Sequence, residues 1–159
     1  SSTLFELKII YFLRSGIYNF LDRYEENLTQ TDLKEIYRKS FSANTYFASA
    51  NAITEEGEIF NVDGNGNRVA AILYGPDKVI LIVGVNKIVK NIDEAIKRNK
   101  DISGPANAKR LNLQTPCAKV GYCMDCKSKD RICCEYTVIK RQRNENRIHV
   151  IFVNDNLAF

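Results

Sequence analysis

Apolar residues at helical spacing predict two helices in the first forty residues. The run Leu4–Leu13 follows Thr3 and precedes a basic and glycine-containing segment at 14–16 that is typical of a helix end. Thr3 and Glu6 have the spacing of a capping box, so Thr3 is expected to cap this helix. A second helix is expected from Asp32 to about Ser40, with Thr31 as its cap. Its apolar face consists of Leu33, Ile36, Tyr37 and Ser40.

Short apolar stretches after residue 45 are typical of strands. The first three are expected at Tyr46–Asn51, Glu58–Val62 and Arg68–Tyr74, because turn-forming clusters at 55–57 and 63–67 separate them. Lys78–Val85 is apolar on both faces, which indicates a central parallel strand covered by helices.

The second half of the chain alternates between helix and strand. Asn91, with Glu94 three residues later, predicts a helix that continues to about Lys100. The last strands are expected at Cys133–Lys140 and Arg147–Val153. This order predicts an α/β fold with a mainly parallel sheet and flanking helices, in one domain over residues 1–159.

The composition excludes several classes of protein. Of the 159 residues, 45% are hydrophobic and only three are proline, which excludes a mainly disordered chain. The longest apolar runs, Val79–Val85 and Ile148–Val153, are shorter than the roughly 18 residues of a membrane helix. The N-terminal stretch has no basic flank or cleavage site of a secretory signal, so we expect a cytoplasmic protein without a membrane partner.

Charge is distributed unevenly along the chain. Residues 1–60 hold six Lys or Arg and nine Asp or Glu, whereas residues 61–159 hold 17 and 10. A basic half attracts either a nucleic acid or a small anionic metabolite. Acidic residues are interleaved throughout, and the basic run 140–143 has no aromatic residues for base stacking. The small anion is therefore the preferred partner.

Four of the five cysteines have a spacing that suits a metal. Cys117, Cys123, Cys126 and Cys133, with Cys134 beside the last, follow the pattern C-x5-C-x2-C-x6-C-C. A Cys-x-x-Cys turn and two further thiols form a tetrahedral set for zinc or an iron–sulfur cluster. Cys134 is expected to point away from the other four. The alternative is that all five are reduced thiols without a metal.

A glycine-rich segment between two expected strands is a second candidate site. Gly64 and Gly66 allow a ligand to approach the backbone, and Asp63 and Asn67 offer groups for its hydroxyls. Arg68 is able to clamp a carboxylate or phosphate. The pattern lacks the third glycine of a dinucleotide fingerprint, and an ordinary hairpin turn is the simpler interpretation.

The ends of the expected strands and the following helix provide further polar groups. In open α/β sheets, ligands bind beyond the carboxyl ends of the strands. These positions hold Asn51, Asn86, Lys87, Asn107 and Arg110. Solvated loops are the alternative. The single histidine, His149, is expected to be a hydrogen-bonded core residue, and nothing in the sequence identifies a nucleophile or a general base.

Several motifs together resemble the lactate-utilisation (LUD) domain family. They are NAIT at 51–54, NVDGNGNRVAA at 61–71, VGVNKIV at 83–89, PANAKR at 105–110 and the cysteine segment at 115–133. The resemblance implies an α/β fold related to sugar-phosphate isomerases, 5-formyltetrahydrofolate cyclo-ligase and CoA transferases. Some members are linked to L-lactate oxidation through an iron–sulfur enzyme complex, and the family has recurring cysteines at the four positions named above.

The resemblance also implies a missing segment. Family members have a strand and a glycine-rich turn before the Ser-x-Thr-Leu helix, and residues 1–3 are expected to be the remnant of that turn. Part of the sheet and one wall of the cleft are then expected to be absent.

These observations lead to three hypotheses for the function. The first is a domain that binds a small anionic metabolite or cofactor and works with other lactate-oxidation proteins. In it, Arg68, Lys87 and Arg110 supply positive charge. The second is a non-catalytic interaction module with a zinc or iron–sulfur knuckle, contacted through Tyr122 and Met124. Nucleic-acid binding ranks last, and the sequence leaves open whether copies of the chain associate.

Overall fold

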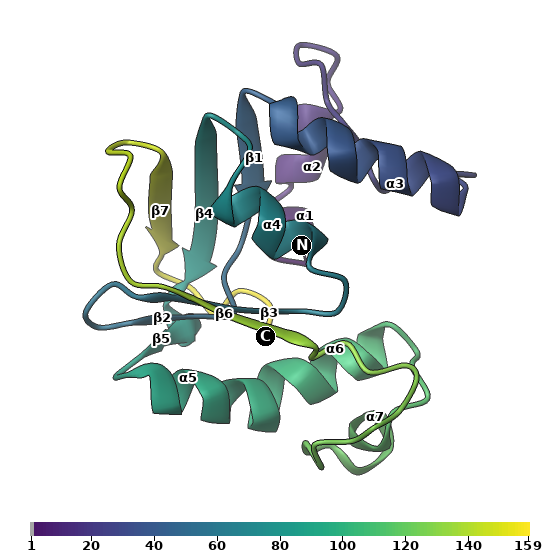
Figure 1. Cartoon of the computed structure of the whole chain (residues 1–159), viewed down its shortest axis with the longest axis vertical. Helices are drawn as coiled ribbons and strands as arrows, with labels where there is room; N and C mark the ends of the chain where they lie inside the picture. Colours follow the sequence, from purple (N-terminus) through teal and green to yellow (C-terminus); the bar gives the residue numbers. More distant parts are fainter. Residues whose placement is uncertain (1) are drawn as a thin grey trace.

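Two small β-sheets lie across each other near the middle of the molecule (Figure 1). The computed structural model describes residues 2–159, so the expected remnant turn at 1–3 is only partly covered and Ser1 lies outside the description. The first sheet has the strand order β1-β4-β7 and the second β5-β2-β3-β6. The strands are β1 (Thr45–Ala48), β2 (Ala52–Thr54), β3 (Ile59–Asp63), β4 (Lys78–Gly84), β5 (Ile88–Val89), β6 (Glu135–Ile139) and β7 (Ile148–Val153).

The first sheet is parallel, and β4 is its central strand as the apolar run 78–85 predicted. Helix α4 (Asn67–Leu73) covers one face, where Ile72 packs among Val79, Leu81 and Val83. The helices α1 (Ser2–Glu6) and α2 (Ile9–Leu13) cover the other face, with their side chains against Ile82. The strand therefore has apolar side chains on both faces because both are buried.

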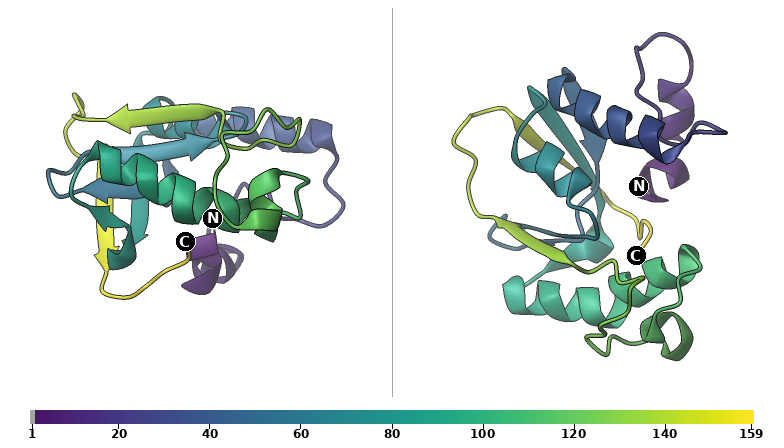
Figure 2. Two further views of the ribbon diagram at one scale, coloured as in Figure 1. Left: turned by 90° about the horizontal axis from the view of Figure 1, so that it is seen from below. Right: turned by 45° about the vertical axis from the view of Figure 1, so that its right-hand side comes forward.

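The second sheet is mixed. The strands β2 and β3 form an antiparallel hairpin, β6 pairs antiparallel with β3, and β5 pairs parallel with β2. Helix α5 (Ile92–Arg98) covers this sheet, with Ala95 packed against Phe60 and Val62 (Figure 2). The α/β fold class predicted from the sequence is confirmed, and its strands are divided between a parallel and a mixed sheet.

The remaining helices begin and end close to recognisable signals. The α5 helix begins after Asn91, whose side chain accepts the Glu94 N–H as predicted. It continues through a π-helical turn, η3 (Asn99–Ser103), into α6 (Gly104–Arg110). Helix α3 begins two residues earlier than predicted, after Thr29 rather than Thr31, because Thr29 and Asp32 form a reciprocal capping box. Its bounds and those of the other short helices are α3 (Gln30–Lys39), η1 (Ser40–Ser42), η2 (Val85–Lys87) and α7 (Pro116–Val120).

The N-terminal helix differs from its prediction in two ways. It is interrupted at Lys8, whose φ of 58° lies in the left-handed region, so that α1 and α2 are separate. The interruption allows Leu4 and Ile10 to reach the same apolar cluster on Ile82. Thr3 is not the cap, since it lies inside α1, is completely buried and faces the interior.

The predicted strand at 68–74 is wrong, because this segment forms helix α4. The carboxylate of Asp63 accepts the N–H groups of Arg68 and Val69, which start the helix without a cap residue of the usual kind. Gly66 adopts a φ of 66° immediately before it. The glycine-rich segment is therefore a strand-to-helix turn, and the hairpin interpretation is also wrong.

The two final strands agree with their predicted ranges to within two residues. His149 is hydrogen-bonded, with its Nε2 2.7 Å from the Asn146 carbonyl oxygen, but it lies on the edge strand β7 and is only half-buried rather than in the core. None of the helices described for residues 2–159 has the combination of length and apolar character that crossing a bilayer requires.

Candidate functional site

A cavity of about 1270 Å³ runs along β1, from Thr45 and Lys78 at the start of β1 and β4 to the segment that follows the carboxyl end of β1. Its lining includes α1, the segment after β1, the turn before α4, the π-helical turn and α6. Ser49 and Asn51 follow the carboxyl end of β1 and Lys87 follows that of β4, so this part of the cavity agrees with the general location of ligand sites in α/β sheets. Thr3, Ser49 and Lys87 contribute polar groups to its wall.

Lys87 is a buried cation without an anionic partner. Its side chain is only 3% exposed, and its ammonium donates to Thr3 Oγ1 at 3.1 Å and to Ser49 Oγ at 3.4 Å. Among the described residues, no carboxylate lies within ion-pair distance of it.

Several charges act on the Lys87 ammonium at longer range. Burial, followed by the positive charges of Arg98 and Arg68, lowers the pKa of Lys87 to about 8, against a smaller opposite effect of Glu6. The cavity wall thus holds an ammonium group whose charge is poorly compensated.

Arg98 is a second buried cation in this region. Its guanidinium donates to the Asn86 and Asn51 carbonyl oxygens and, at 2.7 Å, to Ser103 Oγ. Burial lowers the pKa of Arg98, and no carboxylate pairs with it in the part of the chain that the structure describes. The positive potential that acts on Lys87 therefore comes first from Arg98 on α5 and then from Arg68 on α4.

Arg68 has a different role from the one expected. It pairs with Asp63 at 2.7 Å, and its guanidinium also donates to the Ser49 and Val62 carbonyl oxygens and to the side chains of Asn51 and Asn61. All five N–H groups of the guanidinium are engaged in this way. Arg68 and Asp63 therefore join β3, α4 and the segment after β1, and they leave no free donor for a ligand.

The other predicted site residues fall into two groups. Those that line the cavity, besides the residues already described, are Gly64, Asn67, Asn107 and Arg110. Arg110 is exposed at the rim, where its guanidinium contacts Asn107 Oδ1 at 3.0 Å.

Gly66 and Asn86 do not contribute to the lining. Gly66 precedes α4, and the Asn86 side chain holds the C-terminal tail through the Ala158 carbonyl and the Leu157 N–H. The structure thus brings eight of the ten predicted positions to one cavity.

Sequence reasoning missed Thr3, Ser49, Arg98, Asn99 and Ser103. A signal existed for Arg98, which lies three residues after Ala95 and shares its buried helix face. Thr3 was identified only as a helix cap, and nothing in the sequence connects it with Lys87, from which it is separated by 84 positions.

The cysteine segment borders the same cavity. Cys133 lines it, and its sulfur lies 3.8 Å from the position that a Cβ would take at Gly104. Burial raises the pKa of the Cys133 thiol to about 11, with smaller contributions from Cys123, Cys117 and Cys126. Cys117 is buried, whereas Cys134 is exposed. In residues 2–159 no three side chains are oriented as ligands around one point.

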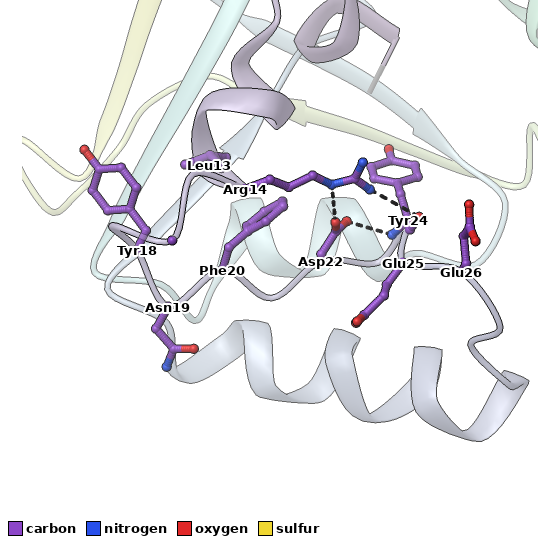
Figure 3. Close-up of a pocket in the computed structure, with 10 residues that line it drawn as sticks. Leu13, Arg14, Tyr18, Asn19, Phe20, Asp22, Tyr24, Glu25 and Glu26 are labelled. Carbon is purple, nitrogen blue, oxygen red and sulfur yellow. Dashed lines mark hydrogen bonds and ion pairs between the residues drawn. The ribbon is translucent and has the colours of Figure 1, made fainter.

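A second hollow lies along the loop 14–26 (Figure 3). It encloses about 780 Å³. Arg14 pairs with Asp22 at 2.6 Å and donates to the Tyr24 carbonyl, so its guanidinium is already bound within the loop (Figure 3). This hollow has no buried cation and is a weaker candidate than the cavity at Lys87.

A comparison with protein families gives one match. The family model described as LUD domain matches residues 1–153, which include Lys87, Arg98 and the cysteine segment. Comparison with curated proteins found no match, and neither did comparison with solved structures.

Proposed function

Because the chain belongs to the LUD-domain family, which implies a role related to lactate utilisation, we propose that its cavity binds the anionic group of a small organic acid. The ammonium of Lys87 is the principal contact. The observation that carries the proposal is the burial of this ammonium beside two hydroxyl groups, with no carboxylate of residues 2–159 within ion-pair distance.

Electrostatics supports an anion at this position. A buried ion without a counter-charge is unfavourable by several kcal/mol, and proteins usually pair such groups or neutralise them. Arg98 adds a second positive charge, and Arg68, although it is paired with Asp63, adds a smaller one. An incoming carboxylate or phosphate would supply the missing negative charge and accept hydrogen bonds from Lys87.

The neighbouring side chains have separate parts in this function. Thr3 and Ser49 accept hydrogen bonds from Lys87 and so hold its ammonium in place. Asn107 and Arg110 at the rim offer donors to a second polar group of the ligand. Asn51 and Arg68 hold the wall together without contacting the ligand.

The experiment is a titration calorimetry series on the full chain. Lactate, pyruvate, a sugar phosphate and a CoA ester are compared, with the uncharged methyl ester of lactate as a negative control. We expect at least one acid to bind and the ester not to bind. Lys87→Met should abolish or strongly weaken binding, whereas Lys90→Met, which removes an exposed lysine nearby, should not. Equal binding to wild type and Lys87→Met would refute the proposal.

A non-catalytic interaction module is the second candidate function. The side chains of Tyr122 and Met124 are more than half exposed in the cysteine segment, and such residues are enriched at protein interfaces. No response to any acid in the series, together with weaker association with a lactate-oxidation protein when Tyr122 and Met124 are changed to Ser, would favour this candidate.

A further inference from the structure

The cavity that contains Lys87 is larger than a small organic acid requires. Its volume is about 1270 Å³, whereas sites for drug-sized ligands usually enclose about 300 to 1,000 Å³. The cavity runs along β1, whose four residues extend over roughly 13 Å. The start of this strand is therefore well separated from Ser49 and Lys87, which leaves room for a second ligand beside it.

The lining of this cavity is basic. The only side-chain carboxylate that lines it within residues 2–159 is that of Asp63, which is already paired with Arg68. Six basic side chains line it, and they are Arg23, Lys39, Arg68, Lys78, Lys87 and Arg110. A small acid bound to Lys87 would leave most of this positive charge uncompensated. The cavity therefore suits a ligand that carries further negative charge.

Arg23 is the cation with the most specific surroundings at the end of the cavity near the start of β1. Its guanidinium carbon lies 4.9 Å from the centre of the Tyr24 ring and 5.7 Å from that of the Tyr37 ring. Within residues 2–159, no carboxylate lies at ion-pair distance from this guanidinium. The two rings hold the guanidinium without cancelling its charge. A guanidinium in this state can bind a phosphate group through two N–H donors.

Tyr46 places a hydroxyl group near this guanidinium. It is the second residue of β1, and it lines the cavity. Burial raises the pKa of its hydroxyl, and among the charges that act on it the effect of Arg23, which lowers the pKa, is the largest. In the part of the chain that the structure describes, this hydroxyl has no hydrogen-bond partner. It is therefore a free donor for an anion that binds to Arg23.

We propose that this end of the cavity binds a nucleotide, with its phosphate groups at Arg23 and the Tyr46 hydroxyl and its base against the neighbouring aromatic rings. Phe20 and Tyr24 come from the loop 14–26 (Figure 3), and Tyr37 lies on α3. Aromatic rings beside an arginine are the kind of surface on which bases stack. A lone phosphate or an acidic peptide would use the cations but not the rings.

Nucleotide binding at this end goes beyond the proposed function and does not depend on it. The organic acid is assigned to Lys87, which follows the carboxyl end of β4. The nucleotide is assigned to Arg23 and Tyr46, which lie before β1 and near its start. The two ligands can therefore be tested separately on the same protein.

The test is titration calorimetry on the full chain with ADP, GDP and UDP as separate probes. The matching nucleosides, which have no phosphate, and inorganic pyrophosphate, which has no base, are the controls. We expect at least one of the three nucleotides to bind about tenfold more tightly than its nucleoside or pyrophosphate, because both parts of the molecule contribute. Pyrophosphate that binds as tightly as every nucleotide would overturn the inference, because the rings would then contribute nothing.

Variants locate the nucleotide site within the chain. Arg23→Gln should weaken nucleotide binding about tenfold or more, and Tyr46→Phe should weaken it about fivefold. Arg38→Gln is the control and should leave nucleotide binding unchanged, because Arg38 lies on α3 but does not line the cavity. Arg23 and Arg38 are both exposed, so both variants are expected to fold, which urea unfolding checks.

The outcomes for the two ligands are distinguishable. No binding of any of the three nucleotides, or equal effects of Arg23→Gln and Arg38→Gln, would overturn the nucleotide site. Nucleotide binding with the expected pattern, while no organic acid binds, would support the nucleotide site and refute the proposed function alone. Acid binding that depends on Lys87, without nucleotide binding, would overturn the nucleotide site alone.

Discussion

Replacing Lys87 by Met should make the protein more stable and its ligand binding weaker. Methionine has nearly the volume of lysine without its charge, so it removes the buried ammonium and leaves the packing around Thr3 and Ser49 largely unchanged. A residue retained for stability would give the opposite result, because its removal would destabilise the fold. Higher stability together with weaker ligand binding is therefore typical of a residue that serves binding.

The size of the effect follows from the pKa of Lys87. It falls from 10.5 to about 8 on folding. Each unit corresponds to about 1.4 kcal/mol, so the buried charge destabilises the fold at pH 7 by about 3 kcal/mol. The two hydroxyl groups lose a donor in the variant, although they remain in contact with each other at 3.4 Å. This loss offsets about 1 to 2 kcal/mol of the stabilisation gained by removing the buried charge. A net stabilisation of the variant of about 1 to 2 kcal/mol remains.

The stability difference between the wild type and Lys87→Met depends on pH. The pKa of Lys87 is lower in the folded chain, so the unfolded chain binds more protons between pH 8 and 10.5 and the wild type gains stability as pH rises through this range. The advantage of Lys87→Met should be fully present below pH 8 and disappear toward pH 10.5. Urea unfolding of the wild type and Lys87→Met at pH 7 and pH 10, with Lys90→Met as control, measures this difference in the free energy of unfolding. A variant less stable than the wild type at pH 7, or a difference that does not change with pH, would refute the reasoning.

Three further predictions concern the same region. The affinity for the organic acid should be constant below pH 8 and fall about tenfold per pH unit above it, because Lys87 must be protonated to bind the acid. Calorimetry at several pH values measures this dependence, and an affinity that does not change with pH would contradict the prediction. Arg68→Met should destabilise the fold by about 3 to 5 kcal/mol because it leaves Asp63 unpaired. Lys39→Met, at an exposed ion pair, is the control and should change the free energy of unfolding by less than about 1 kcal/mol. Similar values for both variants would be inconsistent with the Arg68 network. Gly104→Ala should destabilise the fold by about 1 to 3 kcal/mol, because the new Cβ would lie 2.9 Å from the Asn99 carbonyl oxygen. Thermal or urea unfolding measures the change, and an unchanged midpoint of unfolding would contradict the close packing of the π-helical turn.

Local signals in the sequence predicted the parts of the fold that depend on neighbouring residues. The apolar run 78–85 became the central strand β4, because a strand buried on both faces must be apolar on both. Asn91 became the cap of α5 because its partner, Glu94, is three residues away. In both cases the physical cause lies within a few residues of the element.

Predictions failed where contacts with residues outside the element itself determine its structure. The segment 68–74 has apolar residues at positions compatible with either a strand or a helix, and the choice depends on the Asp63 carboxylate that accepts its first N–H groups. Thr3 had the spacing of a cap, but burial against Lys87 determines its position. Arg68 was expected to bind a ligand, and only the structure reveals that five protein acceptors occupy its guanidinium.

The site itself was predictable as a set of strand ends but not as a charge distribution. Asn51 and Lys87 follow adjacent parallel strands, and the general rule for α/β sheets places them together. The rule for α/β sheets does not predict which Lys and Arg side chains have a carboxylate partner. Arg98 and Lys87 lack carboxylate partners because of how α5 and η2 pack, which no spacing in the sequence reveals.

The most direct test of the central claim is the pKa of the Lys87 ammonium, followed by NMR of the lysine side-chain resonances and assigned with Lys87→Met. In the free chain we expect a value of about 8, and in the presence of the acid that binds we expect it to rise toward or above the ordinary 10.5. A value near 10.5 in the free chain that does not move when the acid is added would contradict the account.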